Sequence, residues 1–159
     1  MIESCICEQG LHFSMLPLGV RDLLAGGAAQ SKISGTVLVI DDEEVCRQAA
    51  TILLRSLFDK IVTVSSAEEA IKYLYESSKE VTLILSDIDL PQMSGLEFLS
   101  EIKQHRVFRS IPVIMQTGCV TVERRSCLDV GASGFLQKPY TQSALYKAIK
   151  KLRIGGLLC

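Results

Sequence analysis

Short apolar runs recur along this chain from position 36 onward. They are TVLVI (36–40), KIVTV (60–64), VTLILS (81–86), IPVIMQ (111–116) and GFLQ (134–137). Most are rich in Val and Ile, the β-branched residues that favour strands. The first run is apolar throughout after its Thr, which predicts a strand buried on both faces of a sheet.

Between these runs, apolar residues recur at spacings of three and four, the period of one face of an α-helix. The stripes are Val45, Ala49, Ile52 and Leu53; Ala67, Ala70, Ile71 and Leu74; Phe98, Leu99 and Ile102; and Leu145, Ala148, Ile149 and Leu152. Ser66 with Glu69, and Ser94 with Glu97, have the spacing of a capping box at a helix start. A further helix is expected at about 121–130, where the apolar stripe is poor.

The strict alternation of strands and helices predicts an α/β domain with a parallel sheet, helices on both faces and right-handed crossovers. This domain would span 36–154. Residues 1–35 read as an N-terminal tail or linker, since LLAGGAAQSKISG is rich in Gly, Ala and Ser. The preceding FSMLPLGVRDLL fits a short amphipathic helix or a disordered tail equally well, and 155–159 would be a short C-terminal tail.

Composition and charge exclude several classes of protein. A hydrophobic content of 48% fits a globular domain and excludes a chain that is disordered throughout. No run approaches the ~18 consecutive apolar residues of a membrane span, and MIESCICEQG lacks the features of a secretory signal, so a cytoplasmic location is expected. A net charge of −1 without a basic stripe argues against direct nucleic-acid binding.

The cysteines do not have the spacing of a metal site. They are Cys5, Cys7, Cys46, Cys119, Cys127 and Cys159, without a CxxC pair and with only two His in the chain. Reduced thiols are therefore expected, with Cys46, Cys119 and Cys127 acting as small buried apolar residues.

Reactive and polar residues follow four of the five predicted strands. Asp41 and Asp42 follow the first, Asp87 and Asp89 the third, Thr117 and Gly118 the fourth, and Lys138 and Pro139 the fifth. Each has an ordinary explanation when taken singly; Asp, for example, is a preferred helix N-cap. Ligands of open parallel sheets, however, bind at the carboxyl ends of the strands, so the set predicts a site at that edge.

The electrostatics of this edge point to a cation. Asp41, Asp42 and Asp87 would converge there, and two carboxylates ~4 Å apart repel by about 4 kcal/mol at an effective dielectric of ~20. Such a cluster needs a cation or raised pKa values. Lys138 would supply one positive charge, and a hard ion with oxygen ligands, Mg²⁺, would supply two more.

The segments VIDDEE, LILSDIDLPQMSGLEFL, MQTG and LQKPY, in this order and spacing, resemble the receiver domain of bacterial response regulators over about 36–154. The resemblance implies a flavodoxin-like fold with strand order 2-1-3-4-5. It implies a signalling module whose only catalysis is its own phosphorylation and dephosphorylation. The partners would be a histidine kinase or histidine phosphotransfer protein and a downstream target bound by the last two strand–helix units. The module would be a monomer or a phosphorylation-dependent dimer.

The resemblance also assigns roles residue by residue. Asp87 would accept the phosphoryl group, and Asp42, Asp87 and the backbone carbonyl of Asp89 would ligate Mg²⁺, with Asp41 acting mainly through a metal-bound water. Thr117 and Lys138 would each contact a phosphoryl oxygen. Lys138 and Pro139 would be joined by a cis peptide, a form that costs only ~0.5–1 kcal/mol before proline.

Three residues have tuning or switching roles in this scheme. Phe135 would be the aromatic that moves together with Thr117 on phosphorylation, or else a fixed core residue. Asp89 and Cys119 would tune the lifetime of the phosphoryl group.

Two other functions stay open. The DID of 87–89 resembles the DxD of haloacid-dehalogenase-type phosphatases, although their nucleophile follows the first strand and Asp87 follows the third. A pseudo-receiver that is never phosphorylated is opposed by the intact set of acids, Thr117 and Lys138. Mg²⁺-dependent phosphorylation by acetyl phosphate would separate these functions.

Overall fold

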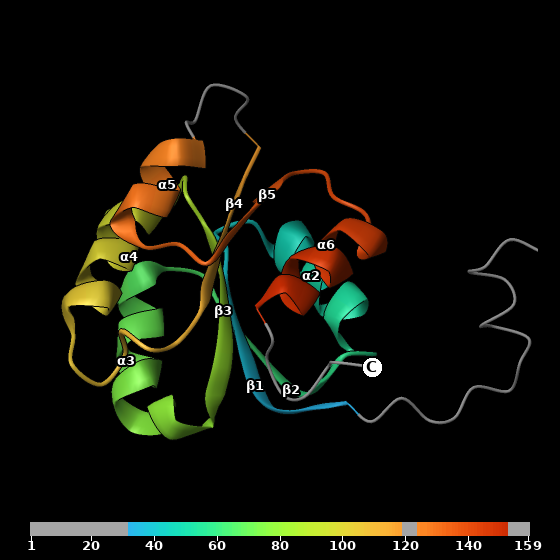
Figure 1. The fold of residues 1–159 in the computed structure, drawn as a ribbon, viewed down its shortest axis with the longest axis horizontal. Helices are drawn as coiled ribbons and strands as arrows, with labels where there is room; N and C mark the ends of the chain where they lie inside the picture. Colours follow the sequence, from blue (N-terminus) through green and yellow to red (C-terminus); the bar gives the residue numbers. More distant parts are fainter. Residues whose placement is uncertain (1–31, 119–123, 153–159) are drawn as a thin grey trace, which may run out of the picture. The chain divides into compact units, whose positions relative to one another are not determined.

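The computed structural model describes residues 32–118 and 124–152 of the chain, and within them five strands form one parallel sheet (Figure 1). The strands are β1 (Ile33–Ile40), β2 (Phe58–Val64), β3 (Val81–Asp87), β4 (Val113–Thr117) and β5 (Gly134–Gln137). The helices are α2 (Glu44–Leu54), α3 (Ala67–Ser77), α4 (Gly95–Gln104), α5 (Arg124–Val130) and α6 (Gln142–Lys151), with a 3-10 turn at Ser78–Glu80. The strand order β2-β1-β3-β4-β5 is that of a flavodoxin-like fold, so the predicted fold class is confirmed.

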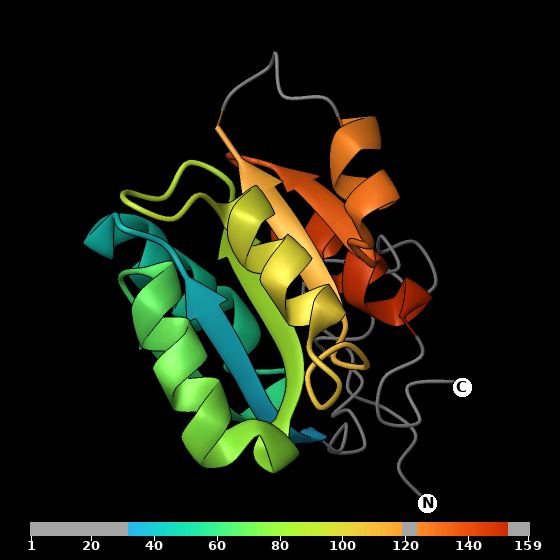
Figure 2. The same ribbon diagram turned by 90° about the vertical axis from the view of Figure 1, so that its left-hand side faces the viewer.

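The helices cover the two faces of the sheet. Helices α2 and α6 lie on one face and α3, α4 and α5 on the other (Figure 1), and Figure 2 views the sheet from the side of α3 and α4. Each layer of helices has its own core cluster, because consecutive residues of a strand point to opposite faces. In β1, Leu38 and Ile40 belong to the cluster under α3 and α4, whereas Val37 and Val39 belong to the cluster under α2 and α6.

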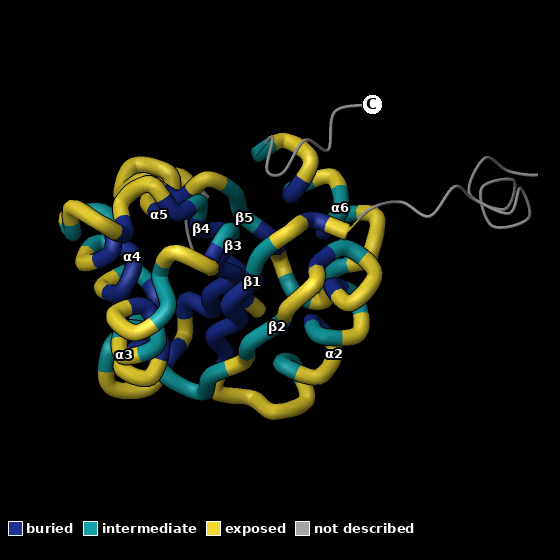
Figure 3. Tube along the Cα trace, turned by 90° about the horizontal axis from the view of Figure 1, so that it is seen from below, coloured by how far each residue is buried: buried dark blue, intermediate teal, exposed yellow. Residues whose placement is uncertain are grey.

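The central strands are buried on both faces, as the apolar runs predict. Residues 37–40 of β1 and 83–85 of β3 have no exposed surface. They form the dark blue centre of the molecule in Figure 3. Burial of this kind fixes the register of the strands, since a shift by one residue would turn each side chain to the other face.

Of the apolar stripe by which helix α2 is recognised, only Leu53 packs against the core. Val45 and Ile52 are 77% and 59% exposed, whereas Ala50 and Leu54 are fully packed against the sheet. Two apolar stripes run along this helix, and their spacing alone does not tell which one faces the core. The other predicted helices do bury residues of their stripes: Ala67, Ala70 and Leu74 in α3; Phe98, Leu99 and Ile102 in α4; Leu145 and Ile149 in α6.

The two predicted capping boxes differ. At α4, the Ser94 hydroxyl accepts from the Glu97 N–H at 3.3 Å, and the Glu97 carboxylate accepts from the Ser94 N–H at 2.9 Å. At α3, Ser66 caps the helix by accepting from the Glu69 N–H, but the Glu69 carboxylate bonds the N–H of Ser65. The box at α4 is therefore confirmed, and the one at α3 is displaced by one residue.

The strand ends decide where the site lies. β3 runs one residue beyond the predicted 81–86 and includes Asp87, and β4 ends at Thr117 rather than at 116. In the ladder Asp87 lies opposite Gln116. Regular backbone pairing therefore extends up to both polar positions.

Several expectations fall on residues outside the described ranges. These are the tail and linker at 1–31, the residues 119–123 that include Cys119, and the end of the chain at 153–159. β1 begins at Ile33, within the stretch expected to be tail. No helix of the described residues is long and apolar enough to cross a membrane.

Candidate functional site

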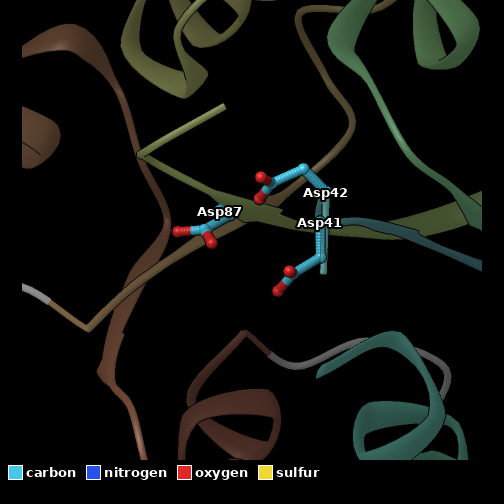
Figure 4. A group of neighbouring side chains, drawn as sticks. All are labelled: Asp41, Asp42 and Asp87. Carbon is cyan, nitrogen blue, oxygen red and sulfur yellow. The ribbon is translucent and has the colours of Figure 1, made fainter. Parts of the chain in front are cut away.

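Three carboxylates meet at the carboxyl edge of the sheet, as predicted (Figure 4). Asp41 and Asp42 directly follow β1, and Asp87 is the last residue of β3. One carboxylate oxygen of each lies within 4.8 Å of the others. Asp41 and Asp87 are buried, whereas Asp42 is exposed. The cluster is thus open to solvent on the side of Asp42.

Lys138 binds two of these carboxylates. Its Nζ donates to Oδ2 of Asp41 at 2.6 Å and to Oδ2 of Asp87 at 2.5 Å. Burial alone would lower the pKa of Lys138, but the two carboxylates outweigh burial and raise it. The ammonium therefore stays charged at neutral pH. The Lys138–Pro139 peptide bond is cis, which confirms that prediction.

The cluster keeps an excess of negative charge. Lys138 balances one of the three carboxylates, and burial raises the pKa of Asp41 more than its bond to Lys138 lowers it. Close carboxylates of this kind are stabilised by a bound cation. Oxygen ligands with one exposed member fit Mg²⁺, which takes few protein ligands and keeps several waters.

The backbone around Asp87 is held closely. Its Oδ1 accepts hydrogen bonds from the N–H of Ile88 at 2.7 Å and of Asp89 at 3.4 Å. The N–H of Gly95, the first residue of α4, donates to the carbonyl of Ile88. A Cβ at Gly95 would lie 1.9 Å from the carbonyl oxygen of Asp87. Glycine therefore allows α4 to begin directly against the backbone of Asp87.

Thr117 and Asp89 contact each other. Thr117 is fully buried at the end of β4, and its hydroxyl donates to Oδ2 of the exposed Asp89 at 3.2 Å. The carbonyl of Thr117 accepts from the backbone N–H of Lys138 at 2.7 Å. The structure thus brings Asp41, Asp42, Asp87, Asp89, Thr117 and Lys138 to one edge of the sheet.

Among the described residues, Arg47, Gln116 and Tyr140 have hydrogen bonds at or beside the site but no role in the sequence analysis. The guanidinium of Arg47 donates to the backbone carbonyls of Asp41 and Asp42 at 2.6 and 2.9 Å. Buried Gln116 donates from Nε2 to Oδ2 of Asp41 at 3.0 Å and accepts from the Tyr140 hydroxyl at 2.7 Å. The sequence does contain a signal for Gln116: it is an amide within an apolar strand, and a buried amide needs hydrogen-bond partners.

A groove of about 490 Å³ adjoins the site between α2 and the loop after β5. It is lined by Glu43, Cys46, Ala49, Ala50, Leu53, Gly118, Lys138, Pro139 and Tyr140. Burial raises the pKa of the Tyr140 phenol to about 12. Burial and the hydrogen bond to Glu43 raise the pKa of the Cys46 thiol to about 11, so it is not a thiolate nucleophile at neutral pH. Cys46 is partly exposed, unlike the expectation for it, whereas Cys127 is buried as expected.

Phe135 lies below Thr117 on the same face of the sheet. Phe135 is opposite Met115 in the β4–β5 ladder, and Met115 lies two residues before Thr117 in β4. Alternate residues of a strand share a face. The ring is half-buried and packs against the core cluster under α3 and α4. It is therefore in a position to respond to movements of Thr117, and both roles considered for it stay open.

Comparisons with known proteins agree with this arrangement. The sequence model of the response regulator receiver domain matches residues 37–150. The two-component response regulator ARR6 of Arabidopsis thaliana is 36% identical over 128 residues, covering 74% of this chain and 66% of its own length. The response regulator-like APRR9 of the same plant is 34% identical over 110 residues, or 69% of this chain. The chain spans only 24% of APRR9.

A solved structure is similar in fold. The CheX–CheY complex with BeF3 and Mg²⁺ from Borrelia burgdorferi has a chain that superposes with a TM-score of 0.69 at 25% identity. The alignment covers 77% of this chain and 91% of that one.

Proposed function

The chain belongs to the response regulator receiver domain family of two-component signalling, and on this premise we propose that Asp87 is its phosphoacceptor. The observation that carries the proposal is the position of Asp87, which ends β3 within hydrogen-bond reach of Lys138 and beside Asp41 and Asp42. Its fixed Oδ1 and its Lys138-bound Oδ2 give the nucleophile a single orientation. Carboxylates in such settings act as nucleophiles toward phosphorus.

The proposed step takes a phosphoryl group from a phosphohistidine. A carboxylate oxygen of Asp87 forms the new O–P bond while the donor's N–P bond breaks. The electron pair of the broken bond goes to the imidazole nitrogen, which then takes up a proton. Lys138 would neutralise one phosphoryl oxygen, and the Thr117 hydroxyl would donate to another.

We further propose that Asp42, Asp87 and the backbone carbonyl of Asp89 hold Mg²⁺, with Asp41 contributing through a bound water. When bound, Mg²⁺ would supply positive charge to the phosphoryl oxygens, the main requirement of phosphoryl transfer. The cluster of carboxylate oxygens within 4.8 Å of one another supports this proposal. The Borrelia burgdorferi complex, which contains Mg²⁺, supports it by similarity.

The upstream partner would be a histidine kinase or a histidine phosphotransfer protein that docks on α2. Val45 and Ile52 are exposed on this helix, and the groove beside them reaches Lys138. Exposed apolar residues next to a site favour protein docking. The downstream partner would contact the units β4–α5 and β5–α6, where Leu128 and Val130 are partly exposed.

Intact-mass measurement after incubation with acetyl phosphate tests the phosphoacceptor. The wild type should gain the mass of one phosphoryl group with Mg²⁺ and none with a chelator, and Asp87→Asn should gain none. Asp59→Asn is the matched control, because Asp59 is exposed at the start of β2, the opposite edge of the sheet. A full mass gain in Asp87→Asn would contradict the assignment.

The same preparation tests the other two functions. A wild type that folds, binds Mg²⁺ and never gains mass would be a pseudo-receiver. Turnover of a generic phosphomonoester would favour a phosphatase, although Asp87 follows the third strand rather than the first. A cytoplasmic location stays a prediction from the sequence.

A further inference from the structure

A chain of hydrogen bonds leads from the acidic cluster to the groove beside α2. The Tyr140 hydroxyl bonds Oε1 of Gln116 at 2.7 Å, and Nε2 of Gln116 bonds Oδ2 of Asp41 at 3.0 Å. Gln116 and Asp41 are 1% and 0% exposed, and Tyr140 is half-buried in the wall of the groove. These bonds are therefore largely protected from competition with water.

The direction of this chain is set by chemistry. An ionised carboxylate only accepts hydrogen bonds, so Gln116 must turn its amide nitrogen toward Asp41. The amide oxygen then faces Tyr140 and requires a donor, which the phenol provides. Tyr140 thereby fixes the orientation of the Gln116 amide, since the opposite orientation would set two oxygens against each other.

The chain restricts the Asp41 carboxylate at both oxygens. Oδ2 accepts from Gln116 and from Lys138, whereas Oδ1 accepts from the N–H of Glu43 at 3.1 Å. A carboxylate oxygen has about two acceptor positions. Oδ2 is thus saturated by protein donors, and Oδ1 keeps acceptor capacity for an ion or its water.

We propose that Gln116 and Tyr140 are positioning residues that lock Asp41 with Oδ1 available to the cation of this site through a bound water. The proposal rests on the function argued above and adds two residues to it. Partners of this kind, which orient a ligand group without touching the ion, typically contribute tenfold or more to metal affinity. Tyr140 acts on Asp41 indirectly, through the amide of Gln116.

The alternative is that Gln116 is a buried amide that is merely satisfied by its neighbours. That role would affect folding, but it would not couple Tyr140 to the ion. The two roles are separated by Mg²⁺ titrations followed through backbone amide and Gln116 side-chain NH₂ resonances in NMR spectra. These readouts need no phosphorylation.

The variants are Gln116→Met, Tyr140→Phe and the double variant. Gln116→Met should weaken Mg²⁺ binding about tenfold, and Tyr140→Phe about threefold, as expected for loss of one hydrogen bond. The double variant should be no weaker than Gln116→Met, because both changes break the same chain. Tyr75→Phe is the matched control, since that phenol is 64% exposed on α3, across the sheet from α2.

Several results would overturn the proposal. They are an unchanged Mg²⁺ affinity in Tyr140→Phe, additive losses in the double variant, or an equal loss in Tyr75→Phe. If Gln116→Met fails to fold, Tyr140→Phe alone tests the proposal. The Gln116 NH₂ resonances must then shift on Mg²⁺ addition in the wild type and shift less in Tyr140→Phe. A wild type that binds no Mg²⁺ would instead contradict the function proposed above, so the two failures are distinguishable.

Discussion

The hydroxyl of Thr117 donates a hydrogen bond to Oδ2 of Asp89 at 3.2 Å. Thr117 ends β4, and Asp89 lies two residues after the proposed phosphoacceptor. A hydroxyl has one proton to donate. Asp89 would therefore compete with a phosphoryl group on Asp87 for the Thr117 proton, and this bond would favour the unphosphorylated arrangement.

Removing this competitor should favour the phosphorylated arrangement. At saturating Mg²⁺, Asp89→Ala should bind beryllofluoride, a phosphoryl analogue, about fivefold more tightly, as expected for loss of one competing hydrogen bond. Isothermal titration calorimetry measures this affinity. In a Thr117→Ala background the same change should have no effect. A gain that persists without the Thr117 hydroxyl would refute the competition.

Mg²⁺ should stabilise the fold by relieving repulsion among the three acids. A ligand that binds the native state at one hundred times its dissociation constant contributes about 2.7 kcal/mol to the free energy of unfolding. Differential scanning calorimetry should therefore show a higher melting temperature with Mg²⁺ for the wild type and for Asp59→Asn. Asp42→Asn should lose most of this rise. An equal rise in all three proteins would mean that the ion binds elsewhere.

Glycine at position 95 should be required for both the fold and the site. Gly95→Ala should lower the free energy of unfolding by about 1–3 kcal/mol, the usual cost of overpacking, because its Cβ would overlap the carbonyl oxygen of Asp87. It should also slow phosphorylation, since the backbone of Asp87 must shift. Gly118→Ala is the control for stability, because no atom of the described residues lies within 4 Å of its added Cβ. Urea denaturation of both variants checks the difference.

The capping box of α4 should give a pH-dependent contribution to stability. Hydrogen bonds from Ser94 lower the pKa of Glu97 from its usual 4.5, so the folded state favours the ionised carboxylate. This contribution is present above pH 4.5 and is lost as the pH falls through the lowered pKa of the folded state. The difference in unfolding free energy between wild type and Glu97→Gln should therefore shrink in acid. An equal difference at neutral pH and in acid would contradict this contribution.

The sequence predicts this site well because its main residues end strands or directly follow them. Once strands and helices alternate, topology brings the carboxyl ends of β1, β3, β4 and β5 to one edge, so Asp87 and Lys138 meet although 51 positions separate them. To predict the hydrogen-bond chain of Gln116 and Tyr140, one must know to which face of β4 the Gln116 amide points. That depends on the register of β4 against β3, which spacing in the sequence does not supply.

The buried face of α2 was not predictable for a related reason. Val45 and Ile52 form a helical stripe as regular as that of Ala50 and Leu54. The choice between the two stripes depends on how the helix packs on the sheet. The exposed stripe is available for the partner docking proposed above, and such a function would leave no separate signal in the periodicity.

The last prediction concerns the response of Phe135 to phosphorylation. Thr117 and Phe135 lie on the same face of the sheet, and the ring is only half-buried, so it has room for a second orientation. Movement of Thr117 toward a phosphoryl oxygen would vacate space beside the ring. Because a Phe ring has no hydroxyl, its orientations would differ by packing and by exposed apolar surface.

NMR spectra of the Phe135 ring with and without beryllofluoride test this coupling. The wild type should show a change in ring environment, and Thr117→Ala should lose most of it while Asp87 still binds the analogue, because a ligand shifts an equilibrium only through differential contacts with its two states. Thr117→Ser is the matched control, since it keeps the hydroxyl and loses only the methyl group. If Thr117→Ala shows the full wild-type change, Phe135 is a fixed core residue and the signal leaves the site by another route.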